Sequence, residues 1–158
     1  MTTSPALDAV TASGVAHRVV EFEPARSLAE AAERRGTTVD RILKTMVVRT
    51  GEDGYVLTLI PGDRVIDWAR LRDHLGLRRL SLADAGQALE ATGYRRGTIT
   101  PFGVPEGLPI LVDEMALGRG EVSVGAGVPG VAIHLDVDDL VAAVGAVPSP
   151  ITKPADDA

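Results

Sequence analysis

The sequence predicts a single domain in which short strands are interspersed with helices. Its 158 residues suit one domain, and a chain of this length buries about two-thirds of its unfolded surface. Apolar residues make up 45% of the chain but aromatic residues only 3%, so the core must consist of Val, Leu, Ile and Ala. Aliphatic runs of strand length recur between capped helical segments and glycine-rich turns, which indicates that both kinds of element pack on this core.

The segment before residue 42 is expected to contain one strand and one helix. Residues 15–22 (VAHRVVEF) have the composition of a strand. A helix is expected to begin after Ser27, because Ser27 and Glu30 have the spacing of a capping box, in which each side chain bonds the other residue's backbone N–H. The alanine-rich run that follows ends at Gly36, which suits the left-handed stop of a helix.

The middle of the chain predicts a hairpin followed by two helices. Residues 42–48 (ILKTMVV) and 55–60 (YVLTLI) are strand-like, and the loop 50–54 is typical of a hairpin, so we expect two antiparallel strands. Residues 67–75 have helical spacing. A further capped helix is expected at 81–92 (SLADAGQALEAT), followed by a glycine stop.

The last part of the chain begins with a long loop at residues 93–107 (GYRRGTITPFGVPEG). This loop holds four glycines and two prolines in fifteen residues, and long loops in compact domains are usually functional or disordered. Short strands are then expected at 109–113, 121–124 and 131–135, and a last helix at 136–144.

The two ends of the chain lack the pattern of a core element. We expect a flexible N-terminus at residues 1–13, which are small and polar and form at most a short helix. The folded domain is then expected to span residues 14–145. Residues 146–158 are Pro-rich without a core-facing pattern, which predicts a disordered tail.

Lys44 stands in the middle of the apolar strand at 42–48. Because side chains alternate along a strand, Lys44 shares one face with Ile42 and Met46. Burying an unpaired ammonium costs several kcal/mol. This lysine therefore either carries its head past its neighbours into water or points into a cleft where the ammonium has a role, and the strand alone leaves both interpretations open.

A lysine on a strand near a glycine-rich loop suits the binding of an anion or of a developing oxyanion. A Schiff-base role for Lys44 has no other support, because no cofactor-binding motif accompanies it. Residues 125–130 do match G-x-G-x-x-G, but residues 131–135 continue as a strand and not as the helix that a dinucleotide site requires. We interpret this run as a tight turn between strands.

Metal and thiol chemistry have little support in the sequence. The chain has no cysteine, and His17, His74 and His134 are scattered without the pairings of a metal site. His134 lies between apolar neighbours and suits a packed histidine better than a catalytic base. No P-loop and no G-x-S-x-G motif is present. We expect no metal and no cofactor.

The chain is acidic, with a formal net charge of −6 and a pI of about 5.0. A nucleic-acid partner would therefore need a local basic patch, for which Arg78-Arg79 and Arg95-Arg96 are candidates; ordinary solvated pairs are the alternative. The acidic charge argues against DNA as a partner. No apolar run approaches a membrane span and the N-terminus lacks a signal sequence, so a membrane is not expected as a partner either. The lack of cysteine fits a cytoplasmic location.

Three segments together resemble the YbaK/ProX family of aminoacyl-tRNA deacylases, relatives of the editing domain of bacterial prolyl-tRNA synthetases. Residues 42–47 (ILKTMV) resemble the family's I-x-K-T-L-V strand, and residues 93–103 (GYRRGTITPFG) resemble its GY-x-x-G-x-x-x-P-x-G loop. Residues 125–127 (GAG), followed by a strand and residues 138–140 (DDL), are similar to its closing segment. The likeness runs in order over about residues 15–145.

The resemblance implies a mixed α/β fold whose curved, largely antiparallel sheet forms a partly closed barrel flanked by helices. It also implies hydrolysis of the ester that joins a mischarged amino acid to the 3′ end of tRNA, with Lys44 as the essential lysine. By the same likeness, Gly97 and Pro101 shape the loop that holds the terminal adenosine and the ester carbonyl. The other substrate-binding residues that it implies are Thr45, Met46, Thr98, Ile99, Gly125, Ala126 and Gly127.

The expected activity is therefore trans-editing of the Cys-tRNA(Pro) or Ala-tRNA(Pro) type. The acceptor end of aminoacyl-tRNA is the expected partner, bound through Arg95 and Arg96, and prolyl-tRNA synthetase is a further candidate. Such an ester is already activated, so the enzyme mainly has to place it, stabilise the oxyanion and admit water. Two alternatives remain: a non-catalytic module that binds a nucleotide or a tRNA terminus, and a small-molecule esterase.

Overall fold

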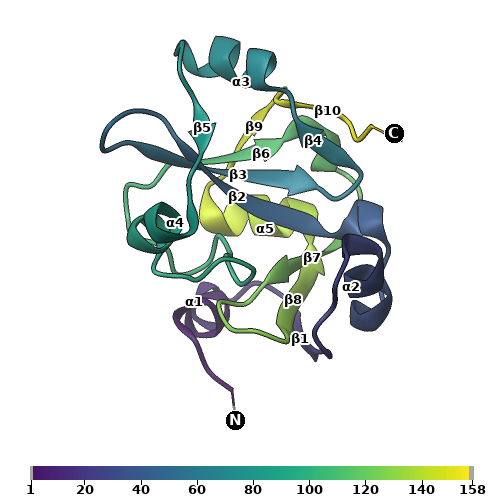
Figure 1. The fold of residues 1–158 in the computed structure, drawn as a ribbon. Coiled ribbons are helices and arrows are strands. Elements are labelled where there is room, and N and C mark those ends of the chain that lie inside the picture. The colour runs from purple at the N-terminus through teal and green to yellow at the C-terminus, as the bar shows by residue number, and fades with distance from the viewer. Residues whose placement is uncertain (1, 157–158) are drawn as a thin grey trace.

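The computed structural model describes residues 2–156 and arranges their strands in three sheets (Figure 1). The largest sheet has the strand order β5-β2-β3-β6-β9. Its strands are β2 (Leu43–Arg49), β3 (Tyr55–Pro61), β5 (Ser81–Leu82), β6 (Ile110–Asp113) and β9 (Val147–Ser149).

The two smaller sheets are antiparallel throughout. One has the order β1-β8-β7 and is built from β1 (Arg18–Glu21), β7 (Glu121–Gly125) and β8 (Val131–Asp136). The other pairs β4 (Arg64–Ile66) with β10 (Thr152–Pro154). In the large sheet, β6 runs parallel to both β3 and β9, whereas β2 is antiparallel to β3 and β5.

Five α-helices and two short 3-10 helices complete the described part of the chain. They are α1 (Pro5–Ser13), α2 (Leu28–Arg35), α3 (Trp68–Leu75), α4 (Ala85–Thr92), α5 (Val137–Val144), η1 (Val39–Arg41) and η2 (Glu114–Ala116). Each α-helix begins at a serine or aspartate whose side chain accepts a backbone N–H, as the sequence predicts for Ser27. Within residues 2–156, none of these helices combines the length and apolar character that crossing a membrane requires.

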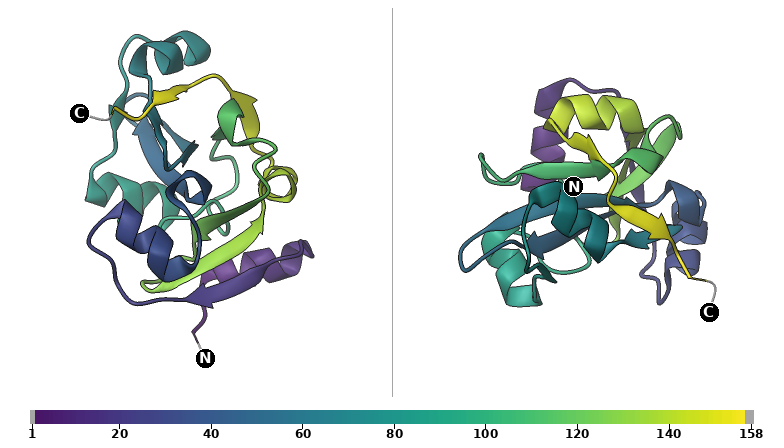
Figure 2. Two further views of the ribbon diagram at one scale, coloured as in Figure 1. Left: turned by 90° about the vertical axis from the view of Figure 1, so that its right-hand side faces the viewer. Right: turned by 90° about the horizontal axis from the view of Figure 1, so that it is seen from above.

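The helices cover different sides of the sheets. As Figure 2 shows, α1 and α5 lie together at the back of the molecule in the view of Figure 1, and α4 lies at its front. Helix α3 lies beyond the β4 and β10 end of the molecule, at the top of Figure 1.

The alternation predicted for the lysine strand is confirmed by the two apolar cores. Leu43 and Val47 of β2 belong to the larger core, which also holds Leu140 of α5. Val48 belongs to the smaller core, which is built with Leu71 of α3. Because β2 contributes to both cores, each of its faces is held by packing.

The mixed α/β class and the largely antiparallel pairing are confirmed, but the partly closed barrel is not. Among the described residues the strands form three separate sheets, and none of them closes on itself. The sheets approach each other where Ile42, just before β2, forms a single parallel bridge with Ser123 of β7. One bridge joins two sheets at a point and does not continue a ladder around a barrel.

The helix predicted from Ser81 begins later in the structure. Ser81 and Leu82 instead pair with Arg49 and Val48 of β2 as the short strand β5. The helix cap is Asp84, which forms a complete capping box with Gln87. Asp84 and not Ser81 therefore caps the helix, because Asp84 forms the capping box with Gln87 while Ser81 and Leu82 gain hydrogen bonds as a strand. The first strand is likewise shorter than predicted, because only residues 18–21 pair with β8.

For the residues that the structure describes, both ends pack on the domain and are not flexible tails, although the short helix allowed at residues 1–13 is present as α1. At the N-terminus, Ala6 and Val10 of α1 are completely buried in the larger core. At the C-terminus, β9 and β10 pair with β6 and β4, and Ile151 between them is completely buried. A few widely spaced apolar side chains are enough to anchor each end, because residues of the sheets surround them. Residues 1, 157 and 158 lie outside the described residues.

His134 of β8 is buried, with only 1% of its surface exposed. It stands between Arg18 of β1 and Ser123 of β7 in the strand register, and its Nδ1 lies 3.6 Å from the Glu121 carboxylate. Burial lowers the pKa of His134, the guanidinium groups of Arg18 and Arg35 lower it further, and Glu121 opposes them. The histidine is therefore packed within the sheet, as its apolar neighbours predicted.

We expect Ile151→Ala to lower the free energy of unfolding by about 2–5 kcal/mol, because it leaves a cavity in the smaller core. Val147→Ala in β9 is the control, since Val147 is 54% exposed; its effect should stay within about 0.5 kcal/mol. Chemical denaturation measures both. Equal, small effects would show that residue 151 does not pack as described.

We also expect stability to fall in acid because of His134. A folded-state pKa below the ordinary 6.5 means that the unfolded chain binds the proton more readily, so this contribution is present above pH 6.5 and is lost as pH falls through the folded-state pKa. Denaturation at pH 7.5 and at lower pH should show a smaller loss for His134→Gln than for the natural chain. His17→Gln should not reduce that loss.

Candidate active site

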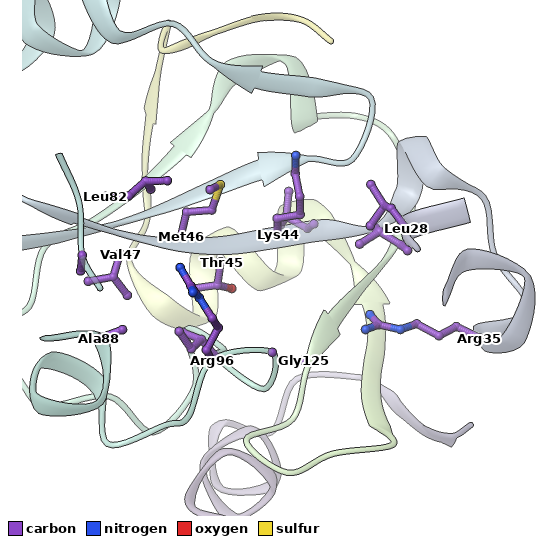
Figure 3. Close-up of a pocket in the computed structure, with 15 residues that line it drawn as sticks. Leu28, Arg35, Lys44, Thr45, Met46, Val47, Leu82, Ala88, Arg96 and Gly125 are labelled. Carbon is purple, nitrogen blue, oxygen red and sulfur yellow. The ribbon is translucent and has the colours of Figure 1, made fainter. Parts of the chain in front are cut away.

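A cleft of about 350 Å³ opens in front of β2, between α2, α4, β7 and the loop that precedes β6 (Figure 3). Backbone and side chains of β2 form its back wall, and the other segments form its rim. The lining residues are Leu28, Arg35, Ile42, Leu43, Lys44, Thr45, Met46, Val47, Leu82, Ala83, Ala88, Arg96, Gly97, Ile99 and Gly125.

The cleft exists because one edge of β2 is paired only at its two ends. Ile42 bridges to Ser123 at one end, and Val48 and Arg49 pair with β5 at the other. The Ile42 carbonyl accepts from Gly62 N on the β3 side, whereas the Val47 carbonyl accepts from Ala83 N on the β5 side. Backbone groups alternate between the two edges of an antiparallel strand. Those of residues 43 and 45 therefore face the open edge and the cleft.

Thr45 is the polar residue of this open edge. Its Oγ1 is buried and has no hydrogen-bond partner among residues 2–156. In Figure 3 its side chain lies on the same side of β2 as Arg96 and Gly125. A buried hydroxyl without a partner is costly, so Thr45 together with its own backbone N–H offers an unused hydrogen-bonding site to a ligand in the cleft.

Lys44 lines the cleft, but its ammonium leaves on the other side of β2. Nζ donates to the Arg64 carbonyl of β4 at 3.0 Å, and in Figure 3 the side chain points away from Gly125. Burial lowers the pKa of Lys44, and the nearby Asp63 carboxylate opposes that shift. The expected approach of the ammonium to the glycine-rich loop is therefore absent in this structure. Lys44 is half-buried and lines the cleft, so its placement shares features with both sequence interpretations, and the role of its ammonium stays a prediction.

The loop at residues 93–107 is held by bonds within itself. The Tyr94 hydroxyl donates to the Phe102 carbonyl at 2.6 Å, and Thr98 Oγ1 donates to the Arg95 carbonyl at 2.8 Å. Burial raises the pKa of Tyr94 to about 12, which keeps this donor protonated at neutral pH. The loop is thus a shaped wall of the cleft, as its glycines and prolines predicted.

The loop and the closing Gly-Ala-Gly turn touch directly. Gly127 N donates to the Thr98 carbonyl at 2.9 Å. A Cβ on Gly125 would lie 2.8 Å from the Ile99 carbonyl oxygen, and a Cβ on Gly127 would lie 2.6 Å from the Tyr94 ring. Both positions therefore require glycine for close approach, and the two distant motifs form one structural unit.

The structure separates the predicted site residues into three groups. Seven of them line the cleft: Lys44, Thr45, Met46, Arg96, Gly97, Ile99 and Gly125. Thr98, Pro101, Ala126 and Gly127 lie behind the lining, where Thr98, Pro101 and Ala126 are buried. Arg95 is exposed beside the cleft without lining it.

Sequence reasoning missed Arg35 and the apolar residues of the rim. Arg35 ends α2, and its guanidinium reaches the cleft on the far side of Gly125 from Arg96 in Figure 3. In the sequence it is one of two adjacent arginines at a helix end, where a basic side chain also suits the helix dipole. No local signal distinguishes it from Arg34. In the described part of the chain, no three His, Asp or Glu side chains gather closely enough to hold a metal ion.

A family model described as "Aminoacyl-tRNA editing domain" matches residues 22–143, and the chain belongs to this family. The likeness recognised in the three sequence motifs is thereby confirmed.

Individual relatives agree with this family. The chain is 35% identical over 78 residues to the proline–tRNA ligase of Thermosipho africanus (strain TCF52B), a match that covers 49% of this chain but only 14% of the ligase. It is 31% identical over 104 residues to the "Putative Cys-tRNA(Pro)/Cys-tRNA(Cys) deacylase EbsC" of Enterococcus faecalis (strain ATCC 700802 / V583), covering 66% of this chain and 63% of that protein.

A solved structure matches along almost the whole chain. It is described as a "putative trans-editing enzyme for prolyl tRNA synthetase", and the match has a TM-score of 0.85 and 30% identity. It covers 97% of this chain and 99% of the solved one. The mixed α/β fold is therefore that of the editing domain, including the α1 and C-terminal segments that the sequence motifs did not reach.

We expect Gly125→Ala to cost about 1–3 kcal/mol of stability, because its Cβ would push against two backbone carbonyls of the loop. Gly86→Ala in α4 is the control: its Cβ would meet only an Asp84 carboxylate oxygen at 3.5 Å. An added helical alanine should leave stability unchanged or raise it by about 0.4–1 kcal/mol. Denaturation curves check both, and a Gly125→Ala chain as stable as Gly86→Ala would contradict the contact.

Proposed function

We propose that this protein removes mischarged amino acids from tRNA by hydrolysing the ester at the tRNA 3′ end. The activity is trans-editing of the Cys-tRNA(Pro) or Ala-tRNA(Pro) type, in the compartment where tRNAs are charged, with prolyl-tRNA synthetase as a candidate partner. The observation that carries the proposal is the cleft itself. In a chain of the editing-domain family, the lysine strand, the glycine-rich loop and the closing turn meet around one cavity.

The lining of the cleft supports hydrolysis without a protein nucleophile. None of its fifteen residues carries a carboxylate, an imidazole or a thiol, and Thr45 alone carries a hydroxyl. An aminoacyl ester is reactive enough that positioning and oxyanion stabilisation are the main requirements. Water attacks the ester carbonyl, and the ribose 2′-OH of the substrate assists in place of a side-chain base.

The oxyanion that forms in this attack needs donors inside the cleft. The open edge of β2 offers the Thr45 backbone N–H and hydroxyl, which the strand alternation turns toward the cavity. Lys44 supplies the positive charge in this proposal. To reach the ester, its ammonium must leave the Arg64 carbonyl, and the flexible side chain must then pass around the open edge of β2 to the Thr45 side.

Amino-acid selection falls to the apolar part of the lining. Ile99 stands there with Val47 and Ala88. Two of the other predicted substrate-binding residues do not: the Met46 side chain packs against the smaller core on the Lys44 side of β2, and Thr98 lies behind the lining. A small apolar wall rejects an extra methylene by only about 1–3 kcal/mol, so selection against larger amino acids is steric and modest.

A second candidate function has one observation in its favour. The Lys44 ammonium is bonded to β4 and turned away from the loop, an arrangement that also suits a module that binds a tRNA terminus without cleaving it. Hydrolysis decides between the two functions.

The decisive experiment measures release of amino acid from a panel of aminoacyl-tRNAs, with Ala-tRNA(Pro) and Cys-tRNA(Pro) first. We expect Lys44→Ala to lose at least about 100-fold in kcat/KM, the scale of one lost oxyanion-stabilising group. Lys153→Ala removes the other lysine of the chain, which is exposed, and should keep full activity. Binding of tRNA without release from any substrate supports the binding module, and full activity of folded Lys44→Ala overturns the assigned role.

Binding of tRNA through the loop arginines predicts a distinct salt effect. The double variant Arg95→Ala/Arg96→Ala should weaken tRNA binding and reduce the slope of log K against log salt by about 1 for each phosphate that is no longer neutralised. Arg78→Ala/Arg79→Ala tests the other candidate pair, which is exposed and does not line the cleft, and it should change the slope less. A slope in Arg95→Ala/Arg96→Ala equal to that of the natural protein would remove these two arginines from the tRNA interface.

A further inference from the structure

Arg35 is a cation at the edge of the cleft without a counter-ion. Within residues 2–156 its guanidinium forms no ion pair, and its Nε is buried without a hydrogen-bond partner. Its neighbour Arg34, by contrast, is tied to the Glu30 carboxylate one helical turn earlier. Two adjacent arginines of α2 therefore have opposite surroundings.

The position of Arg35 is set by two contacts that leave most of its donors unused. Nη1 donates to the Ser123 hydroxyl of β7 at 3.2 Å, and the guanidinium carbon lies 4.6 Å from the centroid of the Phe22 ring. Ser123 is completely buried. The contact with the ring and the single hydrogen bond from Nη1 orient the planar guanidinium. Because a guanidinium has five N–H donors, most of them remain for a ligand.

The surroundings of this end of the cleft favour a bound anion. Burial lowers the pKa of Arg35, which shows that its charge is poorly solvated there. The lining beside it is apolar, with Leu28, Ile42 and Gly125, and no lining residue is acidic. A partly desolvated guanidinium gains most from an oxyanion with at least two free oxygens, because its paired N–H groups then bond both.

We propose that Arg35, oriented by Ser123 and Phe22, binds a phosphate group of the substrate's terminal nucleotide. This inference rests on the proposed function, in which the 3′-terminal adenosine enters the cleft. The phosphate that joins this nucleotide to the chain occupies the Arg35 end, and the esterified amino acid lies along the wall formed by Val47, Ala88 and Ile99. Arg35 thus sets the register of the ester against the open edge of β2.

The test compares two small substrates that differ only in the phosphate: 3′-O-alanyl adenosine 5′-monophosphate and 3′-O-alanyl adenosine. We expect the natural protein to prefer the phosphorylated ester in kcat/KM by about 10- to 100-fold, the value of one charge-assisted hydrogen-bonding pair. Arg35→Met should reduce that preference toward unity. Arg34→Met is the matched control and should retain it, because Arg34 is paired at the surface.

A purely structural role for Arg35 would lower activity on both esters equally, and an unchanged preference in Arg35→Met would overturn the proposal. If that variant does not fold, Arg35→Lys decides: it keeps the charge but loses the paired donors and the ring contact. A preference reduced several-fold supports the phosphate site, and a full preference contradicts it. Arg35 could instead bind a carboxylate on the side chain of the esterified amino acid, and a comparison of aspartyl with asparaginyl esters tests this. If Arg35 is needed for a preference for the aspartyl ester but not for a preference for the phosphorylated ester, the phosphate site is contradicted.

Binding measurements separate this inference from the proposed function. The panel of aminoacyl-tRNAs tests the deacylase proposal by itself, and titration with AMP and with adenosine tests Arg35 even if the natural protein hydrolyses neither ester. Tighter binding of AMP that is lost in Arg35→Met and kept in Arg34→Met supports the phosphate site. Equal affinities of the natural protein for AMP and adenosine would refute it.

Discussion

The pairing of β2 is the constraint on which the rest of the structure depends. One edge is paired with β3 along its whole length, whereas the other is held only by the bridge to Ser123 and by the two residues of β5. The unpaired stretch of β2 between the Ser123 bridge and β5 forms the back wall of the cleft. Because both faces of β2 pack in apolar cores, the strand cannot move to close this gap, and its polar groups remain available to a ligand.

The charge of the cleft differs from that of the whole molecule. The chain carries a formal net charge of −6, yet the lining contains Arg35, Lys44 and Arg96 and no acidic residue. Local potentials are set by nearby groups and screened beyond about 10 Å, so an acidic protein can still present a positive cavity to an anionic end of a nucleic acid. The acidic surface elsewhere discourages binding along the rest of a polynucleotide, which suits recognition of an end.

The three cations of the cleft are held in different ways. The Lys44 ammonium is bonded to a backbone carbonyl of β4, Arg35 is oriented by a hydroxyl and a ring, and Arg96 is exposed on the loop. None of the three forms an ion pair with a carboxylate within the described residues. An anionic ligand therefore meets Arg35 and Arg96 without first having to break a salt bridge, whereas Lys44 lies near the Asp63 carboxylate and must first leave the Arg64 carbonyl.

The sequence by itself determined the elements with strong local signals and the family. The hairpin of β2 and β3, the capped helices α2, α3 and α5 and the glycine-rich loop were all predictable, because caps, turns and side-chain alternation act over a few residues. Short segments with weak patterns were not. Ala6, Val10 and Ile151 become core residues only because distant sheets complete their surroundings.

The features of the candidate site can likewise be divided into those that the sequence determined and those that only the tertiary structure decided. Its motifs were visible in the sequence, and the glycines of the closing turn proved to be needed for close packing against the loop. Only the tertiary structure decided which side of β2 each group faces, that the Lys44 ammonium bonds Arg64 of β4, and that Arg35 and not Arg34 enters the cleft. These outcomes depend on strand pairing and helix docking between segments far apart in the chain, and a local pattern holds no information about them.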